Sequence, residues 1–173
     1  KPWVQHLTNQ ARQHLPQGGQ LFLAGHKQEG IKTYADKAAA LFLSPQKAIK
    51  NGDFYSLVLN QNNMPASELL PCEDYPNLRP VFTLQEQPVY SKPGIYGWDK
   101  VDQGSQLLAN TVNAEALPTI KNCLDLGCGY GYLTLASAHL DIGLRTCTDN
   151  NSAAVNACAH NCAQWGLAAE SVL

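Results

Sequence analysis

The sequence predicts an α/β fold built on a parallel sheet, and three observations carry that prediction. An apolar run over 120–126 leads into a sharp turn, and a second strand-like run, 144–148, ends at Asp149. Helix-like stretches separate the strand-like runs, which is the alternation of a doubly wound sheet. The turn holds three glycines at alternate positions: Gly127, Gly129 and Gly131.

The bulk composition is that of a packed globular protein. Of 173 residues, 45% are hydrophobic and 15% are charged, which argues against disorder. No run approaches the roughly 20 apolar residues that span a bilayer, so we expect no membrane segment. A cytoplasmic location is expected from the cysteines, which suit reduced thiols. The chain begins at Lys1 without an initiator Met, and we expect its true start to be missing.

The six cysteines suit reduced thiols better than a disulfide framework, because several fall inside predicted strands and helices. Cys158 and Cys162 lie four residues apart on a predicted helix, and a metal pair is one interpretation. With Ala154 and Trp165 they form an apolar stripe at helical spacing, so buried packing is favoured and no metal is expected.

Charge is uneven along the chain, whose net charge is −2. Residues 1–60 hold seven Lys or Arg against three acids, and 61–173 hold five against eleven. The basic first part would permit contact with RNA, although solvated surface charge explains it equally well.

The first region reads as a strand–helix–strand unit behind a polar helix. Gly25 and Gly30 are too far apart for a cofactor turn, so we interpret this region as structural. A mixed polar stretch over 61–80 is predicted to be a linker. The expected elements are helix 3–15, strand 20–24, helix 33–43 and strand 55–59.

The second region begins with a predicted hairpin and continues with alternating strands and helices. Asp102 or Ser105 is a plausible N-terminal cap for the first helix. An open parallel sheet needs further crossover units of about 30 residues each, so we expect the chain to be a fragment. The expected elements are strands 81–84 and 88–91, helix 102–117, strand 120–126, helix 132–140, strand 144–148, helix 152–165 and a strand beginning at 171.

The glycine turn has the properties of a cofactor site. Glycines let a ligand approach bare backbone, and the helix that begins near Tyr132 aims unpaired amides at the same place. Asp125 would repel a pyrophosphate and attract the cationic end of S-adenosylmethionine. The third glycine comes one residue too early for the dinucleotide pattern G-x-G-x-x-G, so S-adenosylmethionine is favoured over NAD.

Asp149 supplies the second half of the predicted site. It lies 22 residues after Gly127, about the spacing at which an acid accepts hydrogen bonds from ribose hydroxyls. Asn150 would lie against the adenine, and Cys128 belongs to the turn itself. A purely structural glycine turn is the alternative interpretation.

Several of these motifs resemble the bacterial guanine-N2 ribosomal RNA methyltransferases, the small-subunit enzyme first and its large-subunit relative next. In that family a P-G-x-F-S-R-D-x-x-D-x-G-S-Q-L-L segment precedes a D-x-G-C-G motif. Here the segment reads Pro93-Gly94-Ile95-Tyr96 and Asp99 to Leu108, and the motif reads Asp125 to Gly129. Leu21 to Gly25 with Gly30-Ile31-Lys32 is similar to the end of that family's first domain.

The resemblance implies two domains. Residues 1–79 would be the end of a degenerate methyltransferase-like α/β domain without its own cofactor, followed by a linker. Residues 80–173 would be the first half of a class I S-adenosylmethionine-dependent methyltransferase domain of Rossmann-like type.

The resemblance also implies roles for the site residues. Asp149 would bind the ribose, and the helix that covers the cofactor would open with Asp102, Gly104, Ser105 and Gln106. Simple helix capping is an equal alternative for Asp102 and Ser105. The methionine part of the cofactor would be lined by Asp125, Gly127, Gly129 and Gly131.

Two departures from the family pattern are plain. Tyr96-Gly97-Trp98 replaces F-S-R, and Trp98 could stack on a base, although packing is favoured. The family's N-P-P-F/Y motif, which holds the target amine, is absent from residues 1–173. No catalytic residue is therefore assigned, and we expect that motif beyond Leu173.

The implied function is methyl transfer from S-adenosylmethionine to the exocyclic N2 amine of a guanine in ribosomal RNA. The expected partner is ribosomal RNA or a ribosomal subunit, small subunit favoured, with no membrane and no metal; residues 1–173 alone are expected to be inactive. The alternatives are a methyltransferase for protein or small molecules, an inactive RNA-binding or assembly module, and an NAD dehydrogenase.

Overall fold

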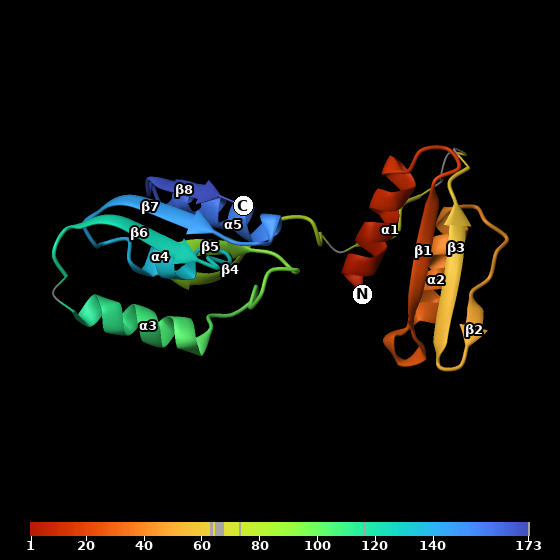
Figure 1. The fold of residues 1–173 in the computed structure, drawn as a ribbon, viewed down its shortest axis with the longest axis horizontal. Coiled ribbons are helices and arrows are strands. Elements are labelled where there is room, and N and C mark those ends of the chain that lie inside the picture. Colours follow the sequence, from red (N-terminus) through yellow and green to blue (C-terminus); the bar gives the residue numbers. More distant parts are fainter. Residues whose placement is uncertain (63, 65–67, 73, 116, 173) are drawn as a thin grey trace. The chain divides into compact units, whose positions relative to one another are not determined.

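The computed structural model describes residues 1–173 except 63, 65–67, 73, 116 and 173. The chain forms two compact units, Lys1–Tyr75 and Pro76–Leu173 (Figure 1). The expected linker over 61–80 lies partly outside the described residues. Within the described part of the chain, no helix combines the length and the apolar character needed to cross a membrane.

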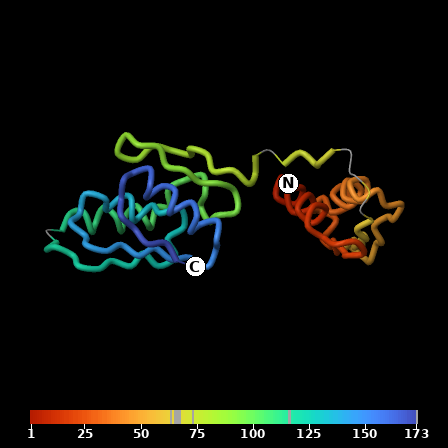
Figure 2. The backbone as a smooth tube through the Cα atoms, turned by 90° about the horizontal axis from the view of Figure 1, so that it is seen from above, coloured from red at the N-terminus to blue at the C-terminus, as the bar shows by residue number. Residues whose placement is uncertain are grey.

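The first unit has two helices and a three-stranded sheet of order β1-β3-β2. Helix α2 packs on the sheet and α1 packs beside α2, as Figures 1 and 2 show. Its core contains Phe42 and Leu59, both fully buried. The elements are α1 (Pro2–His14), β1 (Gln20–His26), the 3-10 turn η1 (Lys27–Glu29), α2 (Ile31–Leu41), β2 (Ile49–Asn51) and β3 (Phe54–Asn60).

Neither the 3-10 turn η1 nor strand β2 was predicted from the sequence. β1 and β2 both run antiparallel to β3, so they are parallel to each other with α2 between them. The chain then turns at Gly52, whose φ is +62°, and β3 enters the sheet between the two. Three exposed residues carry no hydrophobic pattern, which is why β2 was missed.

The second unit contains a hairpin and a parallel sheet of order β6-β7-β8, and the predicted parallel arrangement is confirmed. The strand expected to begin at 171 is β8. The elements are β4 (Arg79–Leu84), β5 (Gln87–Ser91), α3 (Gln103–Ala114), β6 (Ile120–Leu126), α4 (Tyr132–Ala136), β7 (Ile142–Thr148), α5 (Ser152–Gln164) and β8 (Ala169–Val172).

Helices cover one face of this sheet. Helix α5 packs on β7 and β8, α4 lies beside α5, and the β4–β5 hairpin packs against α5 (Figure 1). Helix α3 packs against α4. The other face leaves apolar side chains exposed: Leu124, Leu126, Leu144 and Val172.

Helix α4 ends four residues earlier than the predicted 132–140. The buried guanidinium of Arg145 donates to the carbonyls of Ser137 and Leu140, over 3.3 and 2.9 Å. Because a side chain already satisfies these carbonyls, they do not need backbone amides from another turn of helix. The early end therefore follows from a residue on the next strand, which helical periodicity does not show.

A glycine substitution in the turn between β4 and β5 should stabilise the hairpin. Gln85 and Glu86 both have positive φ, +47° and +65°, and two such residues between paired strands are typical of a turn that prefers Asn-Gly. Because Glu86 has a Cβ, we expect Glu86→Gly to raise the free energy of opening of the β4–β5 ladder by about 1 kcal/mol. Native-state hydrogen exchange measures it.

The matched control is Gln87→Gly, one residue later inside β5. Glycine within a strand costs backbone entropy, so this change should lower the same free energy by roughly 0.5–1 kcal/mol. Shifts in the same direction for both variants would contradict the interpretation of the turn.

Candidate functional site: a cavity at the glycine turn

The glycine turn is tied to the end of the neighbouring strand. The amides of Gly127 and Cys128 donate to the carbonyl of Thr148, over 2.8 and 3.0 Å. The amide of Gly129 donates to Asp149 Oδ2 at 2.9 Å. All three glycines have the positive φ predicted for them, +75°, +55° and +93°. The carboxyl ends of β6 and β7 thus form one edge, which is where open α/β sheets bind their ligands.

A cavity of about 330 Å³ opens at this turn, a size suited to a small ligand. A Cβ added at Gly127 or Gly129 would meet nothing within 4 Å, so bare backbone faces open space. Most of the predicted site residues line this cavity: Asp102, Ser105, Gly127, Cys128, Gly129, Asp149 and Asn150.

Gly131 does not face the cavity. A Cβ at this position would come to 2.9 Å from Cys158 Sγ on α5, closer than side chains tolerate. The third glycine therefore permits close packing of the turn on α5. The structure gives it a packing position where the resemblance implied contact with the cofactor.

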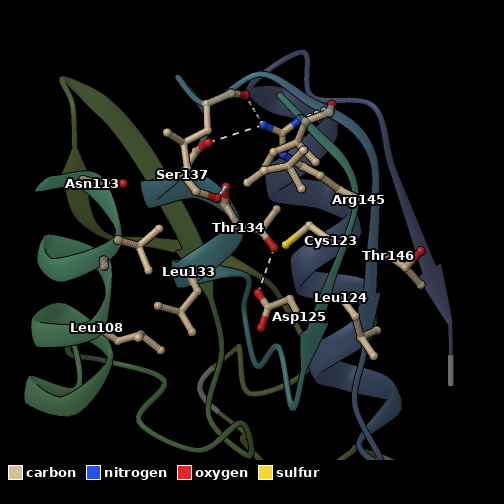
Figure 3. A pocket seen from close by; sticks show the side chains of 15 residues that line it. Leu108, Asn113, Cys123, Leu124, Asp125, Leu133, Thr134, Ser137, Arg145 and Thr146 are labelled. Atoms are coloured by element: carbon tan, nitrogen blue, oxygen red, sulfur yellow. Dashed lines mark hydrogen bonds between the residues drawn. The ribbon is translucent and has the colours of Figure 1, made fainter. Parts of the chain in front are cut away.

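Asp125 also points away from the cavity. Its side chain lines a neighbouring apolar pocket between α3, β6 and α4, where it accepts a 2.7 Å hydrogen bond from Thr134 Oγ1 (Figure 3). Burial raises the pKa of this carboxyl, and the Thr134 hydrogen bond partly offsets that effect. Desolvation disfavours the charged form, which explains the direction.

Asp102 caps helix α3. Its Oδ2 accepts from the Ser105 amide at 2.9 Å and from the Ser105 hydroxyl at 3.2 Å, so the capping prediction is confirmed. The amide hydrogen bond lowers the pKa of this exposed carboxyl. Asp102 therefore keeps a negative charge at the cavity.

Asp149 is held from two sides. Oδ2 accepts from Gly129, and Oδ1 accepts from the Asn151 amide at 2.9 Å. Each carboxylate oxygen has a second lone pair, so both remain able to accept from a ligand. The Asn151 side chain caps α5 and also donates to the Gly94 carbonyl at 2.9 Å.

Several lining residues were not predicted. Tyr96 is 88% exposed, and the hydroxyl of Tyr130 donates to the Lys100 carbonyl at 3.0 Å. Burial raises the pKa of Tyr130 to about 12, so it stays protonated. Tyr96 and Lys100 lie inside the motif that carries the resemblance, and that position was the available signal. The others are Ile95, Gly97, Tyr132, Asn151 and Ala154.

Asn161 positions the turn from behind, and no sequence signal marked it. It is fully buried, and its Nδ2 donates to the Tyr130 and Tyr90 carbonyls at 2.8 Å each. Its Oδ1 accepts from the Tyr90 amide at 2.8 Å. One side chain thus joins α5, strand β5 and the glycine turn.

Trp98 is partly buried and packs against the core of the second unit, as the packing interpretation expects. The guanidinium of Arg79 lies 4.7 Å from the centre of its ring, a cation–π contact.

Comparison with known proteins agrees with this architecture. Residues 86–173, just over half of the chain, match the family model described as the methyltransferase small domain. The chain belongs to the methyltransferase small domain family. The matched segment holds the parallel sheet, α5 and all the residues that line the cavity.

Full-length relatives of this methyltransferase small domain protein extend the match to its first unit. "Ribosomal RNA small subunit methyltransferase C" of Shewanella pealeana is 34% identical over 91% of this chain and 45% of its own length. The proteins of the same name from Shewanella oneidensis and Erwinia tasmaniensis are 28% and 29% identical, over 98% and 90% of this chain. The chain thus spans a little under half the length of these relatives.

A solved structure matches the whole chain. The T. thermophilus 16S rRNA N2 G1207 methyltransferase, in complex with AdoMet and guanosine, superposes with a TM-score of 0.76 at 25% identity. The match covers 99% of this chain and 46% of the other. The predicted class I methyltransferase fold and family are confirmed.

The partial burial of Asp125, which raises the pKa of its carboxyl, leads us to expect a pH-dependent stability. A carboxyl whose folded pKa is raised binds its proton more tightly in the folded state, so stability falls as pH rises through the folded pKa. Asp125→Asn keeps an acceptor for Thr134 and carries no charge. We expect the free energy of unfolding of the variant, relative to wild type, to grow between about pH 4 and pH 7 in urea titrations.

Asp141→Asn is the control, because the exposed Asp141 also accepts from a threonine hydroxyl, that of Thr119 at 3.0 Å. The pH-dependent gain must be larger for Asp125→Asn than for this variant. A gain that does not change with pH would contradict the desolvation of Asp125.

Proposed function

We propose that this protein is an S-adenosylmethionine-dependent methyltransferase that modifies the exocyclic N2 amine of a guanine in ribosomal RNA, small subunit favoured. The observation that carries the proposal is the cavity at the glycine turn, in a chain whose relatives are named for ribosomal RNA methylation. The solved neighbour, which is described as bound to AdoMet and guanosine, supports both the cofactor and the target base.

The residues of the cavity suit S-adenosylmethionine. Gly127 and Gly129 leave room for a ligand against the backbone. Asp102 and Asp149 line the cavity and would receive the positive charge and the ribose hydroxyls, and the exposed Asn150 lines the same cavity. Cys128 and Ser105 complete the wall. We assign Gly131 and Asp125 supporting positions, because neither lines the cavity.

Bound there, S-adenosylmethionine would supply an electrophilic methyl group on a sulfonium. The task of these residues is to bind and orient it and to keep water away, which accounts for much of the rate in such transfers. The amine of guanine is a weak nucleophile, since its lone pair is delocalised into the ring. Acceptors that polarise the amine are expected in the N-P-P-F/Y motif. Because residues 1–173 lack that motif, we expect them to show no methyltransferase activity by themselves.

We retain the domain assignment as part of the proposal. Residues 1–79 would belong to a domain without cofactor, and residues 80–173 to the cofactor-binding domain. The first part, which carries the basic excess, would approach ribosomal RNA or the ribosomal subunit. A cytoplasmic location follows from that partner.

Cofactor binding is tested by a pair of matched glycine variants. Gly127 and Gly166 have φ of +75° and +65°, and a Cβ at either would meet nothing within 4 Å. Their alanine variants should therefore lose similar stability, on the order of 1–2 kcal/mol. Only Gly127 lines the cavity, so only Gly127→Ala should weaken binding of S-adenosylmethionine, at least tenfold by calorimetry on the full-length protein.

Equal weakening by Gly127→Ala and Gly166→Ala would mean that the loss reflects general strain. If the wild-type protein takes up no S-adenosylmethionine, the cofactor assignment is wrong.

The substrate is tested with the full-length protein, methyl-labelled S-adenosylmethionine and small ribosomal subunits from cells that lack the enzyme. Digestion of the RNA should yield labelled N2-methylguanosine and no other labelled nucleoside. Label in protein or in small molecules would favour the corresponding alternative substrates. Retention on RNA without any label would indicate a binding or assembly module.

A further inference from the structure

Four buried cysteines meet between the parallel sheet and α5. Cys147 lies on β7, Cys158 and Cys162 lie one turn apart on α5, and Cys128 lies in the glycine turn. Their exposed fractions are 0, 0, 2 and 6%. All four are free thiols, and Leu167 and Ala169 pack over them. We call this group the thiol cluster.

The sulfurs lie close to the separation that a tetrahedral metal requires. The Sγ atoms of Cys147, Cys158 and Cys162 all lie within 4.8 Å of one another. Zinc–thiolate bonds of about 2.3 Å place the sulfurs of a tetrahedral site about 3.8 Å apart. Shifts of about 1 Å in the sulfur positions would bring the three Sγ atoms to the separation of a tetrahedral zinc site. Cys128 packs in the same buried cluster, outside the group of three close sulfurs, and is the remaining thiol that could supply a fourth ligand.

A hydroxyl beside the cluster lacks a partner. Ser171 on β8 is paired in register with Cys147 on β7, so the two side chains share one face of the sheet. Ser171 Oγ is buried and has no hydrogen-bond partner. Buried hydroxyls are rarely left unsatisfied, and hydrogen bonds from outer groups to the ligands are a regular part of metal sites.

A buried cation also lies beside the cluster. Arg145 is two residues before Cys147 on β7, hence on the same face, and only 8% of it is exposed. Its terminal nitrogens donate to the carbonyls of Ile142, Ser137 and Leu140. In the described part of the chain no carboxylate lies within salt-bridge distance of it, and its Nε has no partner. A buried charge is costly without compensation. A divalent ion with three thiolates carries a net charge of −1, and with Cys128 as a fourth thiolate −2; either is opposite in sign to Arg145.

We propose that the thiol cluster is a binding site for a thiophilic divalent ion of the zinc class, held by Cys147, Cys158 and Cys162 with Cys128 as fourth ligand. Thiolates select such ions over magnesium or calcium. Simple packing of small apolar groups accounts for the burial of the cysteines. It leaves the buried hydroxyl of Ser171 and the Nε of Arg145 without a hydrogen-bond partner.

Binding is a ligand exchange that changes no oxidation state. Each thiol loses a proton to solvent as its sulfur–metal bond forms, and the ion gives up water. The bound ion would lie directly behind the glycine turn, because Gly131 already lies against Cys158. It would stiffen the turn, and this inference does not depend on which ligand the cavity holds.

Cobalt substitution tests the site. The reduced, metal-free 173-residue chain is titrated with Co²⁺ without oxygen, and Zn²⁺ is then added. We expect one Co²⁺ per chain, with the near-ultraviolet band of thiolate-to-cobalt charge transfer and the strong visible bands of tetrahedral coordination. Zn²⁺ should displace it. Absence of these bands, or weak octahedral bands alone, would overturn the proposal.

Two alanine variants separate the cluster from the other thiols. Cys158→Ala should lower the affinity for Co²⁺ at least tenfold and weaken the charge-transfer band. The control is Cys123→Ala on β6, since Cys123 lies outside the cluster and is half-buried. It should bind as wild type does. Equal effects of the two variants would refute the assignment.

A measurement on the wild type covers the case in which Cys158→Ala does not fold. X-ray absorption at the zinc edge should show sulfur neighbours at about 2.3 Å. A first shell of nitrogen and oxygen would overturn the proposal. So would a chain that binds no zinc and whose cluster peptides carry a disulfide after non-reducing digestion.

Discussion

The approach of the glycine turn to helix α5 is the contact on which the second unit depends. Position 131 can lie against Cys158 because it has no Cβ; a methyl group there would come to 2.9 Å from Sγ. Asn161, one helical turn further along, holds the Tyr130 carbonyl of the same turn at 2.8 Å. These two contacts fix the turn between β6 and α4, and so they shape both the cavity in front of it and the thiol cluster behind it.

The same geometry separates two acids that the sequence places at one edge of the sheet. The Asp149 side chain points to the glycine turn and accepts a hydrogen bond from the Gly129 amide. Asp125 lies one residue before the end of β6, where its side chain faces α4 and accepts a hydrogen bond from Thr134 in an apolar pocket (Figure 3). The negative charge at the cavity therefore comes from Asp149 and Asp102. Asp125 acts on the site through packing and through Thr134, whose hydroxyl also lies 3.3 Å from Cys147 Sγ.

Much of the fold could be predicted because the spacing of apolar residues indicates whether a segment is a helix or a strand and which of its faces is buried. Strand β6 was predicted with the bounds that the structure gives it, and helices α1 and α5 within a residue or two. The failures share one cause. β2 is short and wholly exposed, and α4 ends early where Arg145, on another strand, holds the carbonyls of Ser137 and Leu140 beyond its last residue. A local pattern carries no information about a partner supplied from elsewhere in the fold.

The sequence by itself determined the order of the elements, the glycine turn and its positive-φ glycines, and the acid that follows β7, since all of these are read from local backbone requirements. Only the tertiary structure decided that Gly131 packs on Cys158, that Asp125 leaves the cavity, and that cysteines from a turn, a strand and a helix share one space with Ser171. Those groupings depend on the register of β7 between β6 and β8 and on how α5 crosses them. Register and crossing are set by packing between distant segments, which no single segment encodes.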